Sequence, residues 1–160
     1  MTCLDTDTRR YIALDVECVA TGKRHDDHEV CLVAVVDSSE RIILKRTVKP
    51  EKPVFSYLTP LTGVKKGDLD HGGKLCDTIK EVKSLLGPDV VLVGHGVKQD
   101  IKWLQLEQGK DYNSFVELSH MFKVYNSRYR NYDFFSLQHE ANTLLTQGLC
   151  IIITVSLLYD

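Results

Sequence analysis

The hydrophobic pattern of this chain changes period at about residue 49, and that change limits the folds open to it. Residues 11–18 alternate as a β-strand does, and one side of that strand is formed by Ile12, Leu14, Val16 and Cys18. Two further segments rich in valine and isoleucine, 30–36 and 41–48, follow after short polar connections. Three consecutive strands joined by short loops predict an antiparallel meander.

Beyond residue 49, segments whose apolar residues recur at helical spacing alternate with short apolar runs. The spacing of apolar residues predicts helices at 75–86 and 97–104, and a third helix that Ser136 caps. Short apolar segments at 90–93 and 115–118 predict buried strands. A meander followed by alternating helices and strands predicts an α/β fold, with a mixed sheet of antiparallel and then parallel strands flanked by helices.

The size and composition of the chain predict a single domain over residues 1–160, with a flexible N-terminus at 1–9. A hydrophobic fraction of 43% and a charged fraction of 26% are near the averages of globular domains, which excludes a disordered or collagen-like chain. The net charge of -2 provides no global positive field. A nucleic-acid partner would therefore have to be held by local basic patches or bound metals.

Cysteine usage and the N-terminal sequence both predict an intracellular protein. The five cysteines are scattered and form no C-x-x-C pair, so reduced thiols are expected. The first ten residues, MTCLDTDTRR, lack the apolar run of a signal peptide. The longest apolar run, 149–159, is shorter than the roughly 20 residues that a membrane-spanning helix needs.

Two acids on the first predicted strand are candidates for a metal site. Asp15 and Glu17 are two positions apart, so they project from the same side of the strand. Two carboxylates held this closely repel unless a cation lies between them, and Mg²⁺ or Mn²⁺ suits such oxygen ligands. An exposed strand end with two solvated acids is the alternative, and D-x-E alone favours it.

A third acid follows the buried strand at 90–93. In the segment VLVGHGVKQDIKWL a strand ends at Gly94 and a helix opens, with Asp100 about one turn into it. Open α/β sheets often place ligands at such strand-to-helix crossovers. If the two strands are neighbours in the sheet, Asp100 meets Asp15 and Glu17; otherwise it is an exposed helical acid.

Taken together, four ordered segments resemble the DEDDh-type 3′-5′ exonuclease superfamily, which has a ribonuclease H-like fold. They are ALDVEC, SYLTPLTGVKKGDLD, VGHGVKQDIKWL and FFSLQHEANTLL, within about residues 11–145. The resemblance is to the branch of RNA exonuclease 4, the interferon-stimulated exonuclease and the deadenylase exonuclease domain. It implies hydrolysis of phosphodiester bonds from the 3′ end of RNA or single-stranded DNA, release of nucleoside monophosphates, and a nuclear or cytoplasmic setting.

The resemblance also implies a two-metal site of Mg²⁺ or Mn²⁺. Asp15 would bridge both metals, Glu17 would help to hold the metal that carries the attacking water, and Asp100 would support the second metal. These three residues are therefore both the predicted catalytic residues and the predicted metal ligands.

The third motif of the family, a histidine five residues before a fourth aspartate, is absent where it is expected. After Leu145 the chain reads TQGLCIIITVSLLYD, so residues 146–160 form an atypical apolar tail in place of the motif and the domain is expected to be C-terminally incomplete. A general base contributes about 10²–10⁴ in rate, which predicts impaired activity. A second departure is Glu117-Leu118-Ser119 where the branch has Asp-Thr, which puts the local polar packing in doubt.

Two other functions stay open at this point. The first is a catalytically inactive, truncated isoform that binds nucleic acid or protein. The second, an aspartyl-phosphate phosphatase, is disfavoured because Glu17 stands where that class has a second aspartate.

A candidate nucleic-acid contact lies between residues 122 and 135, where aromatic and basic residues alternate. Its predicted members are Tyr125, Arg128, Tyr129 and Arg130. Bases stack on aromatic rings and phosphates pair with cations, which suits single strands. Core aromatics beside a solvated basic loop are the equal alternative. The cluster at 25–28, His-Asp-Asp-His, favours an ordinary polar turn over a metal site.

Overall fold

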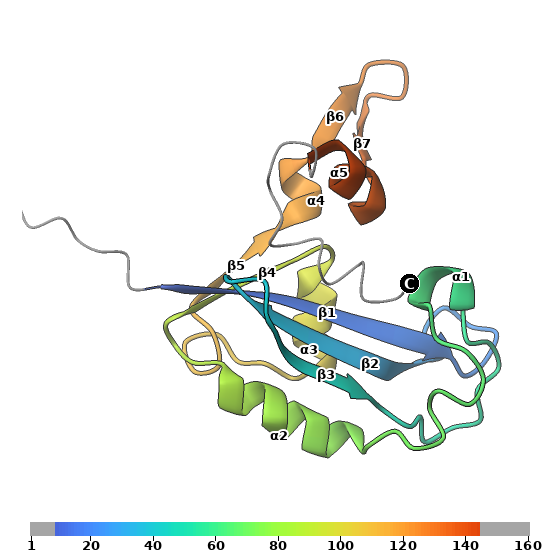
Figure 1. Cartoon of the computed structure of the whole chain (residues 1–160). Helices are drawn as coiled ribbons and strands as arrows, with labels where there is room; N and C mark the ends of the chain where they lie inside the picture. The colour runs from blue at the N-terminus through green and yellow to red at the C-terminus, as the bar shows by residue number, and fades with distance from the viewer. Residues whose placement is uncertain (1–8, 145–160) are drawn as a thin grey trace, which may run out of the picture.

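The computed structural model describes residues 9–144 and is built on one mixed five-stranded sheet (Figure 1). The strands lie in the order β3-β2-β1-β4-β5. Their bounds are β1 Arg10–Ala20, β2 His28–Asp37, β3 Ile42–Thr47, β4 Val90–Gly94 and β5 Ser114–Glu117. The first three strands pair antiparallel, whereas β4 pairs parallel with both β1 and β5. The predicted α/β fold, a meander followed by parallel strands, is confirmed.

Five helices and a small hairpin complete the described chain. The helices are α1 Thr59–Thr62, α2 Leu75–Leu85, α3 Val97–Trp103, α4 Leu118–Met121 and α5 Leu137–Leu144. The hairpin consists of β6 Lys123–Asn126 and β7 Asn131–Phe134, a separate two-stranded sheet. Figure 1 shows α2 along one side of the main sheet, with α4, α5 and the hairpin beyond the other side. None of these helices has the length and apolar character needed to cross a membrane.

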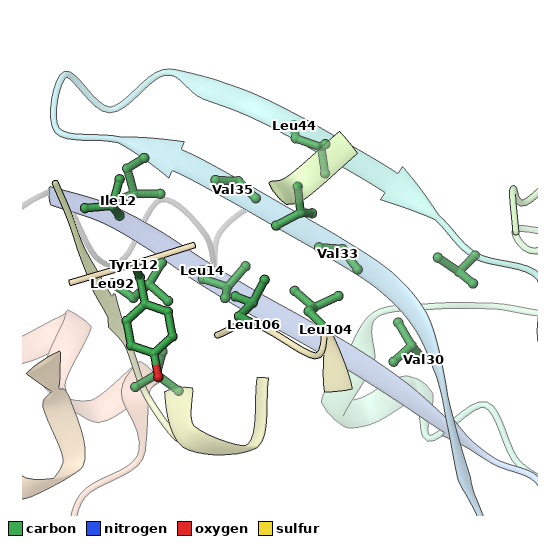
Figure 2. Packing of buried hydrophobic residues seen from close by; sticks show 14 residues of the cluster. Ile12, Leu14, Val30, Val33, Val35, Leu44, Leu92, Leu104, Leu106 and Tyr112 are labelled. Carbon is green, nitrogen blue, oxygen red and sulfur yellow. The ribbon is translucent and has the colours of Figure 1, made fainter. Parts of the chain in front are cut away.

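The main core lies between the sheet and the pair α2 and α3. Ile12 and Leu14 of β1 pack there with Val33 and Val35 of β2 (Figure 2). Val90 of β4, Val82 of α2 and Val97 of α3 belong to the same cluster. The opposite side of the sheet holds a small cluster of Ala13, Ala34 and Val36. The alternation predicted for β1 is therefore confirmed, and its odd-numbered positions face away from the main core.

Three elements were absent from the sequence-based expectation: α1, α4 and the β6–β7 hairpin. The two helices have four residues each, too few to show a helical period. In α1 a local side-chain contact supports the turn, because the Thr62 hydroxyl donates to the Tyr57 carbonyl at 2.9 Å. The hairpin is exposed along most of its length, so its apolar and polar residues do not alternate between core and solvent. The predicted flexible N-terminus, except for residue 9, and the predicted apolar tail at 146–160 lie outside the described residues.

Candidate active site

Asp15 and Glu17 lie on the central strand β1, just beyond the stretch that pairs with β4. Beside them β2 carries a β-bulge: Glu17 pairs with Leu32 and Cys18 pairs with Val30, so that Cys31 is the extra residue. The Cys31 thiol donates to the Glu17 carbonyl at 3.3 Å. The bulge thus fixes the backbone at Glu17, and bulges beside functional sites commonly re-aim a side chain in this way.

Asp100, on α3, lies near Asp15 and Glu17. This helix opens directly after β4, which is the parallel neighbour of β1, so the adjacency on which the prediction depended is present. Gly94 allows the two strands to approach, because a Cβ there would lie 2.8 Å from the Leu14 carbonyl oxygen. Gly96 precedes the helix with φ 84°, a left-handed conformation that suits glycine. Two glycines thus set the start of the helix that carries Asp100.

The three predicted acids share one electrostatic environment. Asp100 is only 7% exposed and its Oδ2 atom has no hydrogen-bond partner among the described residues. Burial raises the pKa of Asp100 to about 9, and the charges of Asp15, Glu17 and Glu117 add to the rise. Burial likewise raises the pKa of Glu17 to about 7, with a contribution from Asp15. These carboxyl groups are close enough to oppose each other's ionisation.

Glu117, at the end of β5, is a fourth acid beside this cluster. Its carboxylate accepts hydrogen bonds from the Gly96 backbone N–H at 2.7 Å and from the Ser119 hydroxyl at 3.0 Å. The polar packing that the sequence put in doubt at this point is therefore formed. In the sequence Glu117 stands out only as a departure from Asp-Thr. Its place near the end of the predicted strand at 115–118 is the signal that could have pointed to the site.

His95 joins this edge to the segment that follows the hairpin. Its Nε2 atom lies 3.1 Å from the Phe135 carbonyl oxygen and 3.8 Å from Oε1 of Glu140 on α5. Glu140 is buried, which raises the pKa of its carboxyl group. His139 stacks on the Phe135 ring, with the ring centres 5.0 Å apart. Each of these histidines thus has a structural contact of its own.

The remaining predicted contacts lie elsewhere. Tyr125, Arg128, Tyr129 and Arg130 lie on the β6–β7 hairpin or its turn, which is a separate sheet from the one that carries Asp15 and Glu17. The 25–28 segment is the polar turn that the sequence favours, since the His28 ring donates to the His25 carbonyl at 2.8 Å.

The donor chemistry of the acid cluster fits a divalent cation. Within residues 9–144 no group of three or more His, Cys, Asp or Glu side chains is already arranged to hold a metal ion. Yet the cluster combines an unpartnered buried oxygen on Asp100 with two neighbouring carboxylates, and carboxylate oxygens are the ligands that Mg²⁺ and Mn²⁺ prefer. A cation would offset the burial, and the smaller mutual repulsion, that raise the pKa values of Asp100 and Glu17. The metal-binding and catalytic roles of Asp15, Glu17 and Asp100 stay predictions.

A comparison with known protein families shows which family the chain belongs to. The model of the RNase_T exonuclease family matches residues 12–145. The chain belongs to this exonuclease family. RNA exonuclease 4 from Cryptococcus neoformans is 34% identical over 97 residues, which is 61% of this chain and 24% of that protein. RNA exonuclease 4 from Homo sapiens is 33% identical over 101 residues, 63% of this chain and 24% of that protein.

A solved structure agrees on the fold of this exonuclease family member. The Pan2 pseudoubiquitin hydrolase–RNA exonuclease module of Saccharomyces cerevisiae superposes with a TM-score of 0.70 at 17% identity, covering 99% of this chain and 29% of that one. The resemblance to DEDDh exonucleases and the ribonuclease H-like fold are thus confirmed, and the family is one of nucleases. The chain spans about a quarter of the length of the curated relatives named above.

Proposed function

We propose that this exonuclease family member is a metal-dependent 3′-5′ exonuclease of single-stranded RNA that releases nucleoside monophosphates. The observation that carries the proposal is the acid cluster: Asp15 and Glu17 follow the stretch of β1 that pairs with β4, and Asp100 comes from the helix that opens after β4. Among the described residues the buried Oδ2 of Asp100 has no hydrogen-bond partner, and burial raises the pKa of Asp100 to about 9. A divalent cation would stabilise the ionised forms of these partly desolvated carboxyl groups.

Each acid has a distinct place in this proposal. Asp15 and Glu17, projecting from the same side of β1, and Asp100, facing them from α3, would hold two divalent ions. Such ions supply a nucleophilic water at neutral pH and stabilise the leaving oxygen. Asp100 is buried and the bulge at Cys31 holds the backbone of Glu17, so these two acids would be positioned before any ion binds. Glu117 would orient the start of α3 through its bond to the Gly96 N–H.

RNA is the substrate that the relatives favour. The curated relatives named above are RNA exonucleases, and another structure of the yeast Pan2 module, with a TM-score of 0.70, is a complex with AAGGA RNA. The net charge of -2 means that phosphates would be held by metal ions and local cations.

A labelled-RNA digestion tests the proposal. Single-stranded RNA with a 5′ label, incubated with Mn²⁺, should shorten one nucleotide at a time, whereas the same RNA with a 3′ label should release labelled mononucleotide first. Asp15→Asn should lose this activity, and the exposed Asp70→Asn should keep it. Internal cleavage, or trimming by Asp15→Asn at the unaltered rate, would show that the proposal is wrong.

Binding without cleavage is the second candidate. It is favoured by the contacts of two histidines, since His95 and His139 both contact Phe135. The same digestion separates the two functions. RNA that is bound in the presence of Mn²⁺ but stays intact would support the binding module.

A further inference from the structure

The β6–β7 hairpin has two chemically different faces. Cross-strand partners of an antiparallel pair share a face, and Tyr125 pairs with Tyr132 while Lys123 pairs with Phe134. These four residues therefore form one face, named here the aromatic face. The opposite face carries Val124 with Asp133 and Asn126 with Asn131, and the Asn126 amide donates to Asp133 at 2.7 Å.

The rings of the aromatic face are exposed. Tyr125 is 55% exposed, Tyr132 46% and Phe134 54%, and Tyr129 in the connecting turn reaches 68%. Tyr125 and Tyr132 meet edge to face, with ring centres 5.4 Å apart. Each ring therefore keeps a surface open to solvent, which is unusual for a cluster of large side chains unless something binds it.

Cations accompany these rings. Lys123 Nζ lies 4.6 Å from the centre of the Tyr132 ring, and the Arg128 guanidinium lies 5.5 Å from the centre of the Tyr129 ring. Arg130 is exposed in the same turn. Asp133 is the one acid in residues 122–135, and it points to the other face, where it is bonded to Asn126. The aromatic face and its turn are therefore positively charged.

The segments on both sides of the hairpin contact the connection between β4 and α3, just before the helix that carries Asp100. On its N-terminal side, Glu117 accepts from the Gly96 N–H, at the start of the helix that holds Asp100. On its C-terminal side, the Phe135 carbonyl contacts the His95 ring at 3.1 Å. Both connections join the hairpin to residues 95 and 96, between β4 and α3. A nucleic-acid strand whose 3′ end lies at Asp15, Glu17 and Asp100 could therefore continue onto the hairpin.

We propose that the aromatic face, with Arg128 and Tyr129 of the turn, binds single-stranded RNA upstream of the 3′ end. Bases stack on the exposed rings, and the Lys123, Arg128 and Arg130 cations pair with phosphates. The positive charge favours this occupant over a second copy of the chain, whose net charge is only -2 and whose own hairpin repels it. The inference rests on the proposed function and adds to it a binding surface away from the acids.

Binding measured without catalysis tests this surface. The probe is a 5′-fluorescent single-stranded RNA of about 12 nucleotides, a common site size, followed by anisotropy in EDTA so that no cleavage is needed. The double variant Tyr125→Ala/Tyr132→Ala should bind it at least about fivefold more weakly, because base–aromatic stacks are lost. Val124→Ala, an exposed change on the opposite face, is the matched control and should bind as the unaltered chain does.

Separate measurements test the contribution of the cations to RNA binding and the folding of the variants. Lys123→Gln/Arg128→Gln should reduce the slope of log K against log salt by about 0.7 for each lost phosphate contact. Should the double alanine variant fail to fold by circular dichroism, Tyr129→Ala in the turn provides the same test. Tyr125→Phe/Tyr132→Phe should retain binding, since stacking needs the ring and not the hydroxyl.

Equal RNA affinity of the folded alanine variants and the control would overturn the inference. So would a concentration-dependent dimer that these variants abolish while RNA binding persists, because the face would then serve a second copy. Cleavage of a dinucleotide distinguishes this failure from failure of the proposed function. If the chain cleaves the dinucleotide but the hairpin substitutions leave its affinity for longer RNA unchanged, the proposed exonuclease function stands. Only the proposed RNA-binding surface is then wrong.

Discussion

The carboxylate of Asp15, on β1, raises the pKa of Asp100, on α3, although these residues come from different elements far apart in the sequence. Burial of Asp100 is the larger cause of the rise, to about 9, and the same burial leaves its Oδ2 atom without a hydrogen-bond partner among the described residues. The fold thus places an acid where its ionised form is costly. A divalent cation at this position would relieve that cost.

The metal-free protein should lose stability as pH rises. The folded pKa values of Asp100 and Glu17, about 9 and about 7, lie above the ordinary values of 3.8 and 4.5. The folded state therefore binds more protons than the unfolded state between pH 4 and pH 9, so the stabilisation is complete below about pH 4 and declines through that window. In EDTA the Tm should fall by at least about 4 °C from pH 5 to pH 9.

Asp100→Asn separates this effect from general alkaline instability. The variant has no carboxyl group to ionise at the most strongly shifted position, so its Tm should change much less with pH. The exposed Asp70→Asn is the control and should keep the original slope. A Tm that is equally sensitive to pH in Asp100→Asn would locate the cause elsewhere.

Gly94→Ala should weaken the junction between β1 and β4. A Cβ at this position would lie 2.8 Å from the Leu14 carbonyl oxygen and 3.0 Å from the Val97 side chain, so the strand or α3 must shift. The free energy of unfolding should fall by about 1–3 kcal/mol, as overpacking usually costs. Urea denaturation measures the change, and any RNA trimming should fall with it because α3 carries Asp100.

Gly73→Ala is the matched control for this substitution. Its new Cβ would lie 3.9 Å from the Thr47 carbonyl oxygen, an ordinary contact. Stability should stay within about 1 kcal/mol of the original, with a small gain allowed by the stiffer unfolded chain. Equal losses in the two variants would contradict the close approach at Gly94.

Leu92→Ala tests the main core. Leu92 is fully buried in β4 among residues of the principal cluster, so its truncation should cost about 2–5 kcal/mol in the free energy of unfolding. Leu61→Ala, at a side chain that is 78% exposed, should cost no more than about 0.5 kcal/mol. A small effect at Leu92 would mean that the sheet packs differently.

Hydrophobic pattern is sufficient to predict the parts of the fold that are buried. The strand around Leu14 and the α2 helix around Val82 carry a regular period because each has one buried side, whereas the strands around Val33 and Leu92 are apolar throughout because both of their faces are buried. The β6–β7 hairpin has no buried side, so its strands carry no period-two signal, and only its aromatic and basic residues mark the segment.

The sequence predicts the three acids of the cluster but not the residues around them. D-x-E on a strand and an acid one turn into a helix identify Asp15, Glu17 and Asp100 as neighbours once β1 and β4 are adjacent. Glu117 and the buried Glu140 depend on contacts with Gly96 and His95 that no spacing in the sequence reveals. The predicted replacement of the third motif at 146–160 lies outside the described residues and stays a prediction.

Mn²⁺ titration of the intact chain by isothermal calorimetry tests the central claim most directly, because it examines the acid cluster whether or not RNA is cleaved. Saturable binding is predicted, together with its loss or at least about tenfold weakening in Asp15→Asn and Asp100→Asn, since each removes a charged ligand. Asp70→Asn should bind as the unaltered chain does. Identical Mn²⁺ affinity in the unaltered chain and in Asp15→Asn would contradict the account.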